Sequence, residues 1–169
     1  MRRAVAGCLL AALLCLTGCL PSTPLSQQAI VLCMGIDYSP IQKEYQMTGQ
    51  VMDIREEKDQ VICYTAGGQS LRQAADELGR VAGKQIFSGD LPVLLLGSGV
   101  RYEELDEICL YFEEMMPLRP KTQVAFSPLP VAPQIAASEE NLGKQLESAI
   151  QEGEAQGGLI SCPIFQLKS

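Results

Sequence analysis

The chain has 169 residues, 13 of them basic and 20 acidic, for a net charge of −7, and it contains no histidine and no tryptophan. This length suits one domain plus a short targeting segment, and the 47% apolar content is enough for a hydrophobic core. The acid excess argues against a nucleic-acid-binding protein, which would carry a basic patch. Without histidine the chain lacks the commonest general base and zinc ligand, which argues against most hydrolases and metalloenzymes.

The first eighteen residues have the pattern of an export signal. Two arginines precede a stretch of low polarity over 4–16, which is too short to span a bilayer but suits a secretory signal peptide. Residues 16–19, at the end of this stretch, resemble the lipobox of bacterial lipoproteins, whose cysteine takes a diacylglycerol and becomes the new N-terminus. The alternative is an ordinary signal peptide with an incidental cysteine. We predict a signal peptide over 1–18 and a lipidation site formed by Leu16, Thr17, Gly18 and Cys19.

A mature chain beginning at Cys19 would be strongly acidic, so anionic lipid would not attract it and acyl chains such as palmitate must form the anchor. Each buried CH₂ contributes about 0.8 kcal/mol, and two or more chains hold firmly. Residues 19–28 are rich in Pro, Ser, Thr and Gln, which is typical of a tether. We therefore expect a lipoprotein on the outer face of the cell membrane, with one domain over 29–169.

Four cysteines remain in that domain: Cys33, Cys63, Cys109 and Cys162. An exported domain could pair them in three ways. Their wide spacing and apolar surroundings favour buried thiols over disulfides, and without close pairs or histidine a zinc site is not expected.

The first half of the domain has the pattern of three strands and a helix. Residues 29–36 form a continuous apolar run, which is typical of a strand buried on both faces. Residues 45–54 alternate and, after a turn at Ser39-Pro40, predict a hairpin with it. A short strand follows at 61–65. Ser70 then suits an N-cap, with Gln73 at the capping-box position and Gly83 as the stop; the apolar face comprises Leu71, Ala74, Ala75, Leu78 and Val81.

The second half alternates buried strands with helices. Residues 91–96 and 122–126 predict core strands, and 102–116 predicts a helix ended by proline. Three prolines make 127–133 irregular. Ser138 suits the N-cap of a helix to about 152, and the tail 159–169 has strand character.

The resulting order of elements is β-β-β-α-β-α-β-α. It predicts an α+β (α/β-like) domain with a mixed sheet of about four to six strands and two to three helices packed on it.

No group of residues indicates catalysis, a cofactor or a metal. The acids of helix 102–116 are interpreted as a solvated surface, and Tyr102 is placed on its apolar face. Gly67-Gly68 before Ser70 could bind an anion, but a turn explains the glycines equally well. Asp37 ends a buried strand, where turn formation accounts for it as well as catalysis does. The acids of helix 102–116 that are interpreted as a solvated surface are Glu103, Glu104, Asp106, Glu107, Glu113 and Glu114.

Several segments in this order resemble the Ger(x)C family, the lipoprotein C subunits of bacterial spore nutrient-germinant receptors. They are the lipobox, AIVLCMGID (29–37), TAGGQSLRQAADEL (65–78), IFSGDLPVLLLG (86–97) and the basic-Pro-x-Thr strand (119–126). The family has Trp-Asp after the lipidated cysteine where this chain has Leu20-Pro21, and a histidine where it has Asp90. Family chains are more than twice as long, so we expect this chain to supply only their N-terminal domain.

The resemblance implies a non-catalytic, membrane-anchored receptor subunit in spore germination. Its partners would be the integral-membrane subunits, on the outer face of the spore's inner membrane. An exported lipoprotein that binds a small molecule is the alternative, and an exported enzyme ranks last because no nucleophile–base pair is present.

Overall fold

The computed structural model describes residues 28–53, 60–153 and 160–163. The predicted signal peptide and the tether up to residue 27 lie outside these ranges. The elements in chain order are β1 (Gln28–Ser39), β2 (Glu44–Asp53), β3 (Gln60–Gly68), α2 (Leu71–Ala82), β4 (Gln85–Phe87), β5 (Val93–Leu96), α3 (Tyr102–Glu114), β6 (Gln123–Phe126), α4 (Val131–Ala136), α5 (Leu142–Gln151) and β7 (Ile160–Pro163).

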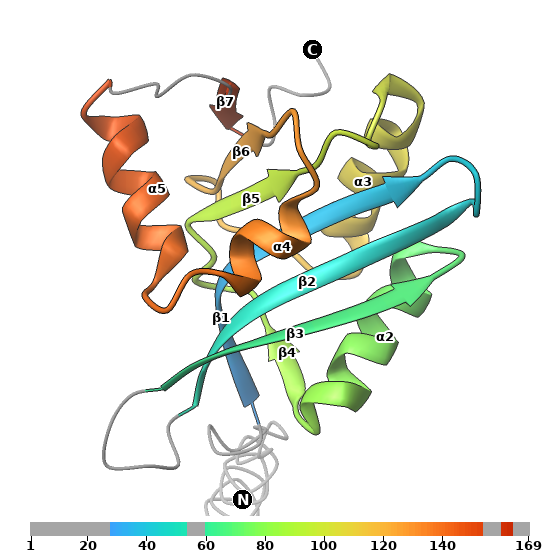
Figure 1. Cartoon of the computed structure of the whole chain (residues 1–169), viewed down its shortest axis with the longest axis horizontal. Helices are drawn as coiled ribbons and strands as arrows, with labels where there is room; N and C mark the ends of the chain where they lie inside the picture. The colour runs from blue at the N-terminus through green and yellow to red at the C-terminus, as the bar shows by residue number, and fades with distance from the viewer. Residues whose placement is uncertain (1–27, 54–59, 154–159, 164–169) are drawn as a thin grey trace, which may run out of the picture.

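One mixed sheet organises the domain, with the strand order β3-β2-β1-β5-β6-β7 and with β4 pairing beside β5 on β1 (Figure 1). β1, β5 and β6 are parallel, whereas β1–β2, β2–β3 and β6–β7 are antiparallel. The predicted α+β class with a mixed sheet is therefore confirmed, as is the hairpin between the first two strands. The sequence pattern did not distinguish the short strand β4 from a loop, because three residues are too few to show a hydrophobic periodicity.

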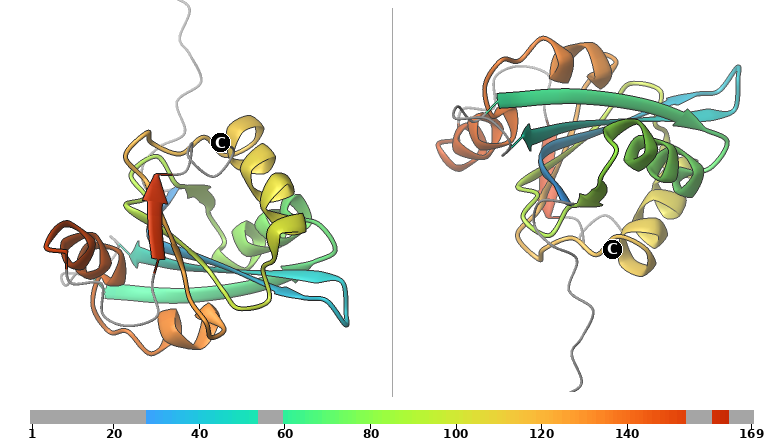
Figure 2. Two further views of the ribbon diagram at one scale, coloured as in Figure 1. Left: turned by 90° about the horizontal axis from the view of Figure 1, so that it is seen from above. Right: turned by 90° about the horizontal axis from the view of Figure 1, so that it is seen from below.

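Helices cover both faces of the sheet, α2 and α3 on one and α4 and α5 on the other (Figure 2). Because side chains alternate along a strand, β5 sends Leu94 and Leu96 to the first face and Val93 and Leu95 to the second. All four are buried. This two-sided burial explains why the segments around β1 and β5 are continuously apolar.

The boundaries of α2 follow the predicted capping residues. Ser70 Oγ accepts a hydrogen bond of 3.2 Å from the backbone N–H of Gln73, and Gly83 ends the helix with φ +62°. The Gln73 side chain accepts from the N–H of Gln69 instead of that of Ser70. Val81, predicted to face the core, is exposed, and Ala82 is buried in its place. Tyr102, predicted to lie on the apolar face of α3, is also exposed, and it is the first residue of that helix.

Two predictions about the region after β6 are wrong. The segment expected to be irregular contains the start of α4, at Val131. Pro133 lies in the first turn of this helix, where a backbone N–H has no partner within the helix, so proline is tolerated. Ser138 does not start the last helix: its N–H bonds to the Ile135 carbonyl at the end of α4. Asn141 caps α5 instead, with its Oδ1 3.0 Å from the Lys144 nitrogen.

Gln50, in the middle of β2, connects the sheet to the loop between α4 and α5. Its side chain is 0% exposed. The amide nitrogen donates to the carbonyls of Ser138 (3.2 Å) and Glu140 (2.8 Å), and the amide oxygen accepts from the N–H of Leu142 (3.0 Å). A buried polar side chain costs free energy unless it is bonded, and here one residue satisfies three backbone groups.

We predict that Gln50→Leu lowers the free energy of unfolding by about 2–4 kcal/mol, because backbone groups of the loop lose their buried partners. Urea unfolding followed by circular dichroism measures the change. Gln46→Leu, on the same strand but exposed, is the control and should change stability by less than about 0.5 kcal/mol. Equal effects of the two variants would contradict the role of Gln50 in bonding the loop between α4 and α5 to the sheet.

Candidate functional site

The carboxyl ends of the parallel strands bring three loops together at one edge of the sheet. These loops are the β1–β2 turn, the β5–α3 connection and the β6–α4 connection. This edge is where an α/β sheet usually presents its functional groups. The side chains that the three loops place at this edge form the candidate site.

Asp37, near the end of β1, caps the remote helix α4. Its carboxylate accepts hydrogen bonds from the backbone N–H groups of Val131 (2.9 and 3.1 Å, one to each oxygen) and Ala132 (3.0 Å). The first N–H groups of a helix have no intrahelical partner and attract negative charge. Asp37 therefore joins β1 to α4, and its carboxylate caps this helix rather than a local turn.

Two glycines permit this close approach. A Cβ on Gly35 would lie 2.6 Å from the Ile135 side chain and 2.7 Å from that of Val131, so α4 could not lie against β1. A Cβ on Gly97 would overlap the Asp37 carboxylate. The Gly97-Ser98-Gly99 segment is thus explained by packing against the end of β1, since Gly99 lies equally close to the Tyr38 carbonyl.

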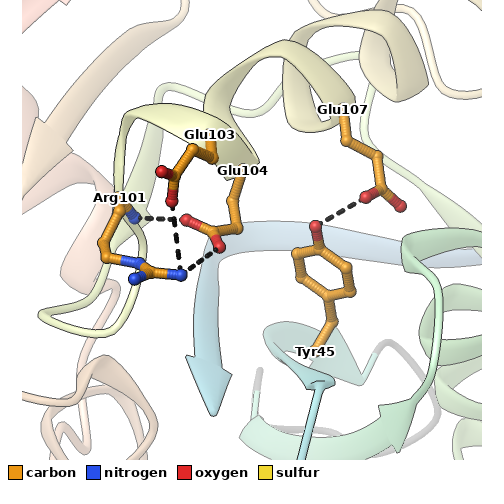
Figure 3. Close-up of polar contacts among 5 residues, drawn as sticks. All are labelled: Tyr45, Arg101, Glu103, Glu104 and Glu107. Atoms are coloured by element: carbon orange, nitrogen blue, oxygen red, sulfur yellow. Dashed lines mark hydrogen bonds and ion pairs between the residues drawn. The ribbon is translucent and has the colours of Figure 1, made fainter. Parts of the chain in front are cut away.

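Two carboxylates of the acidic helix α3 make polar contacts near this edge, Glu104 within the N-terminal turn of the helix and Glu107 with the hairpin (Figure 3). Glu104 is 7% exposed, and its carboxylate accepts from the Arg101 backbone N–H (2.8 Å) and guanidinium (3.2 Å). Glu103 also contacts that guanidinium at 3.3 Å. The hydrogen bond to Glu104 is the main cause of the raised pKa of Arg101. The interpretation of Glu104 as a solvated residue was wrong, although its position three residues after Arg101 is the spacing of a capping box.

Tyr45 of β2 contacts the second carboxylate, that of Glu107 on α3 (Figure 3). Its hydroxyl donates a hydrogen bond of 2.7 Å to Glu107, and its buried ring packs against Tyr38 with 4.8 Å between centroids. Burial is the main cause of the raised pKa of Tyr45, and the bond to Glu107 adds to it. The residue therefore remains a neutral phenol that donates a hydrogen bond, which fixes α3 over the hairpin.

A depression of about 300 Å³ lies at this edge, lined by residues of all three loops and of β1, β2 and β3. The most exposed large apolar side chains of the described residues are Ile41 (94%) in the β1–β2 turn, Tyr102 (79%) at the first position of α3, and Leu129 (62%) in the β6–α4 connection. Exposed apolar groups of this kind mark contact surfaces. The edge therefore suits binding of another molecule.

The other residues singled out in the sequence have different places in the fold. Gly68 allows α2 to begin close to β3, since a Cβ on Gly68 would lie 2.6 Å from the Ala74 nitrogen, and Gly67 lines the depression at the edge. The predicted lipidation residues Leu16, Thr17, Gly18 and Cys19 lie outside the described residues. Within residues 28–53, 60–153 and 160–163 there is no cluster of three His, Cys, Asp or Glu side chains suited to a metal ion.

The cysteines lie away from the edge. Cys33, Cys63 and Cys109 are thiols, and the side chain of Cys162 lies outside the described part. Cys33 and Cys63 both stand opposite Gln50, one on each neighbouring strand. Their Cα atoms are therefore roughly 10 Å apart, too far for a disulfide. Burial, and secondarily the proximity of Cys63, raises the pKa of Cys33 to about 12, so its thiol is inert at neutral pH.

In a comparison with family models, residues 21–167 match the model described as the spore germination protein N-terminal domain. The match covers most of the chain and confirms the resemblance drawn from its motifs. No significant match was found among curated proteins or solved structures. Of the helices that the structure describes, none has the length and apolar character needed to cross a membrane.

We predict that Asp37→Ala lowers the free energy of unfolding by about 1–3 kcal/mol, because the first N–H groups of α4 lose their acceptor. Asp37→Asn keeps one carbonyl oxygen and should lose less. Thermal and urea unfolding measure both variants, with the exposed Asp106→Ala as a control that changes stability by less than about 0.5 kcal/mol. A stability of Asp37→Ala equal to that of the unaltered chain would disprove the cap.

Proposed function

Because the chain belongs to the family of the spore germination protein N-terminal domain, and thus has a role in spore germination, we propose that it is a non-catalytic, lipid-anchored subunit of a nutrient-germinant receptor. The lipid would be attached at Cys19, and the chain would lie on the outer face of the membrane. It would act through contacts with integral-membrane subunits. The observation that carries this proposal is the family match combined with the lipobox pattern.

The direction of β1 supports a division between an anchored end and a contact end. β1 begins at Gln28, the last residue of the predicted tether. Its twelve residues extend over roughly 40 Å to the β1–β2 turn at the far end of the sheet (Figure 1). The tether therefore joins the domain at the amino end of β1, whereas the three loops lie at its carboxyl end.

The composition of the three loops supports a protein partner. Ile41, Tyr102 and Leu129 present apolar surface, and Lys43, Glu44 and Arg101 provide charged groups nearby. Apolar and aromatic residues surrounded by polar ones are typical of interfaces between proteins. Fixed carboxylates, a neutral phenol and the absence of histidine from the chain fit a binding role better than catalysis.

The anchor is tested by Cys19→Ala, which we expect to abolish incorporation of labelled palmitate and to release the chain from the membrane fraction, because the thiol that carries the lipid is missing. Cys15→Ala, in the preceding apolar segment, is the matched control and should retain both properties. Labelling and membrane fractionation in a spore-forming host give the readout. A Cys19→Ala chain that remained acylated and membrane-bound would overturn the anchor.

The contact surface is tested by the triple variant Ile41→Ser, Tyr102→Ser and Leu129→Ser. We expect at least about a tenfold loss of co-purified integral-membrane subunits, since apolar anchors dominate such interfaces. Leu110→Ser, an exposed apolar residue on α3, is the control. Quantitative mass spectrometry of membrane extracts measures the partner. Recovery of the same partner with the triple variant as with the unaltered chain would exclude this surface.

A further inference from the structure

β3 ends the sheet, and among the described residues it pairs only with β2 (Figure 1). An extended strand carries N–H and C=O groups on both sides, so the outer side of β3 presents polar backbone groups that another strand can bond. The strand has nine residues, which is long for an edge. This side of the domain therefore has the hydrogen-bonding capacity to extend the sheet.

β3 also lacks the features that protect exposed edges. Its sequence, QVICYTAGG, contains no charged residue and no proline. The β2–β3 register is continuous from Tyr45↔Gly68 to Asp53↔Gln60, whereas the β1–β2 register shifts between Val31 and Cys33. At the opposite end of the sheet, β7 has only four residues and contains Pro163. Charges, prolines and bulges are the usual means of blocking strand addition, and β3 has none of them.

Side chains on both faces of β3 are incompletely covered. Ile62 and Tyr64 pack at the margin of one hydrophobic cluster, and Cys63 packs at the margin of the other. All three are half-buried. A strand added beside β3 would cover the half-buried side chains on both faces of β3. Hydrogen bonding and burial of apolar surface therefore both favour the addition of a strand here.

The space beside β3 accommodates this addition. A hollow of about 690 Å³ runs along the second half of the strand and the outer side of α2. Its charged lining residues are Arg72, Asp76, Glu77 and Arg80, two of each sign. A surface with balanced charge does not repel a copy of itself.

We infer that β3 is a dimer edge, along which a second copy of this chain pairs its own β3 in antiparallel orientation. A two-fold axis would pass through the middle of the strand and join the two sheets into one. The occupant is a second copy because the uncharged strand brings no like charges opposite one another when it pairs with itself, and because a two-fold axis lets the same groups meet from both sides. The dimer goes beyond the proposed function and does not depend on the lipid anchor or on the three loops.

The test measures the mass of the detergent-solubilised full chain by sedimentation equilibrium, from about 1 µM to about 500 µM. We expect a reversible monomer–dimer equilibrium. The double variant Val61→Lys with Thr65→Lys places ammonium groups on one face of β3, on either side of Cys63. In the dimer the ammonium groups of the two copies lie near one another and repel, so the dissociation constant of the dimer should rise at least about tenfold. Leu110→Lys, at an exposed position of α3, is the control and should leave the dissociation constant unchanged.

Hydrogen exchange of the unaltered chain provides a second readout that does not depend on the folding of the variant. Amides of residues 60–68 should exchange more slowly at high than at low concentration, whereas those of the β1–β2 turn should not change. A chain that stays monomeric over the whole range overturns the inference. So does a dimer that is unaffected by the lysines, or one that forms without protecting β3.

Discussion

The helices α4 and α5, on one face of the sheet, are held to it by polar side chains of the buried strands β1 and β2. The Asp37 carboxylate binds the first N–H groups of α4, and the Gln50 amide binds three backbone groups of the following loop. Between them, Val131 and Ile135 pack on the bare surface of Gly35. This side of the domain thus combines a small apolar cluster with two polar attachments, each of which fully satisfies buried groups.

These attachments also account for the shape of the carboxyl edge. Asp37 fixes the β6–α4 loop against the end of β1, and Gly99 brings the β5–α3 loop to the same strand. Tyr45 and Glu107 then hold α3 over the hairpin. Because the three loops are anchored to one strand, their exposed apolar tips are presented by a rigid base, as a binding surface requires.

The most distinctive sequence motif of the chain therefore has a structural role. In Gly-Ile-Asp, the glycine admits α4, the isoleucine fills the opposite face, and the aspartate caps α4.

The sequence by itself determined the α+β class, the first hairpin, the two-sided burial of β1 and β5, and the ends of α2, because hydrophobic periodicity and capping residues act over a few positions. It also determined the family, through the order of its motifs. Only the tertiary structure decided that Asp37 caps a helix 94 residues away, that Glu104 is buried, and that prolines begin a helix after β6. The cap by Asp37 depends on which distant segment supplies a partner for unsatisfied backbone groups, and the burial of Glu104 depends on how α3 packs against the rest of the domain. Local sequence patterns contain neither kind of information.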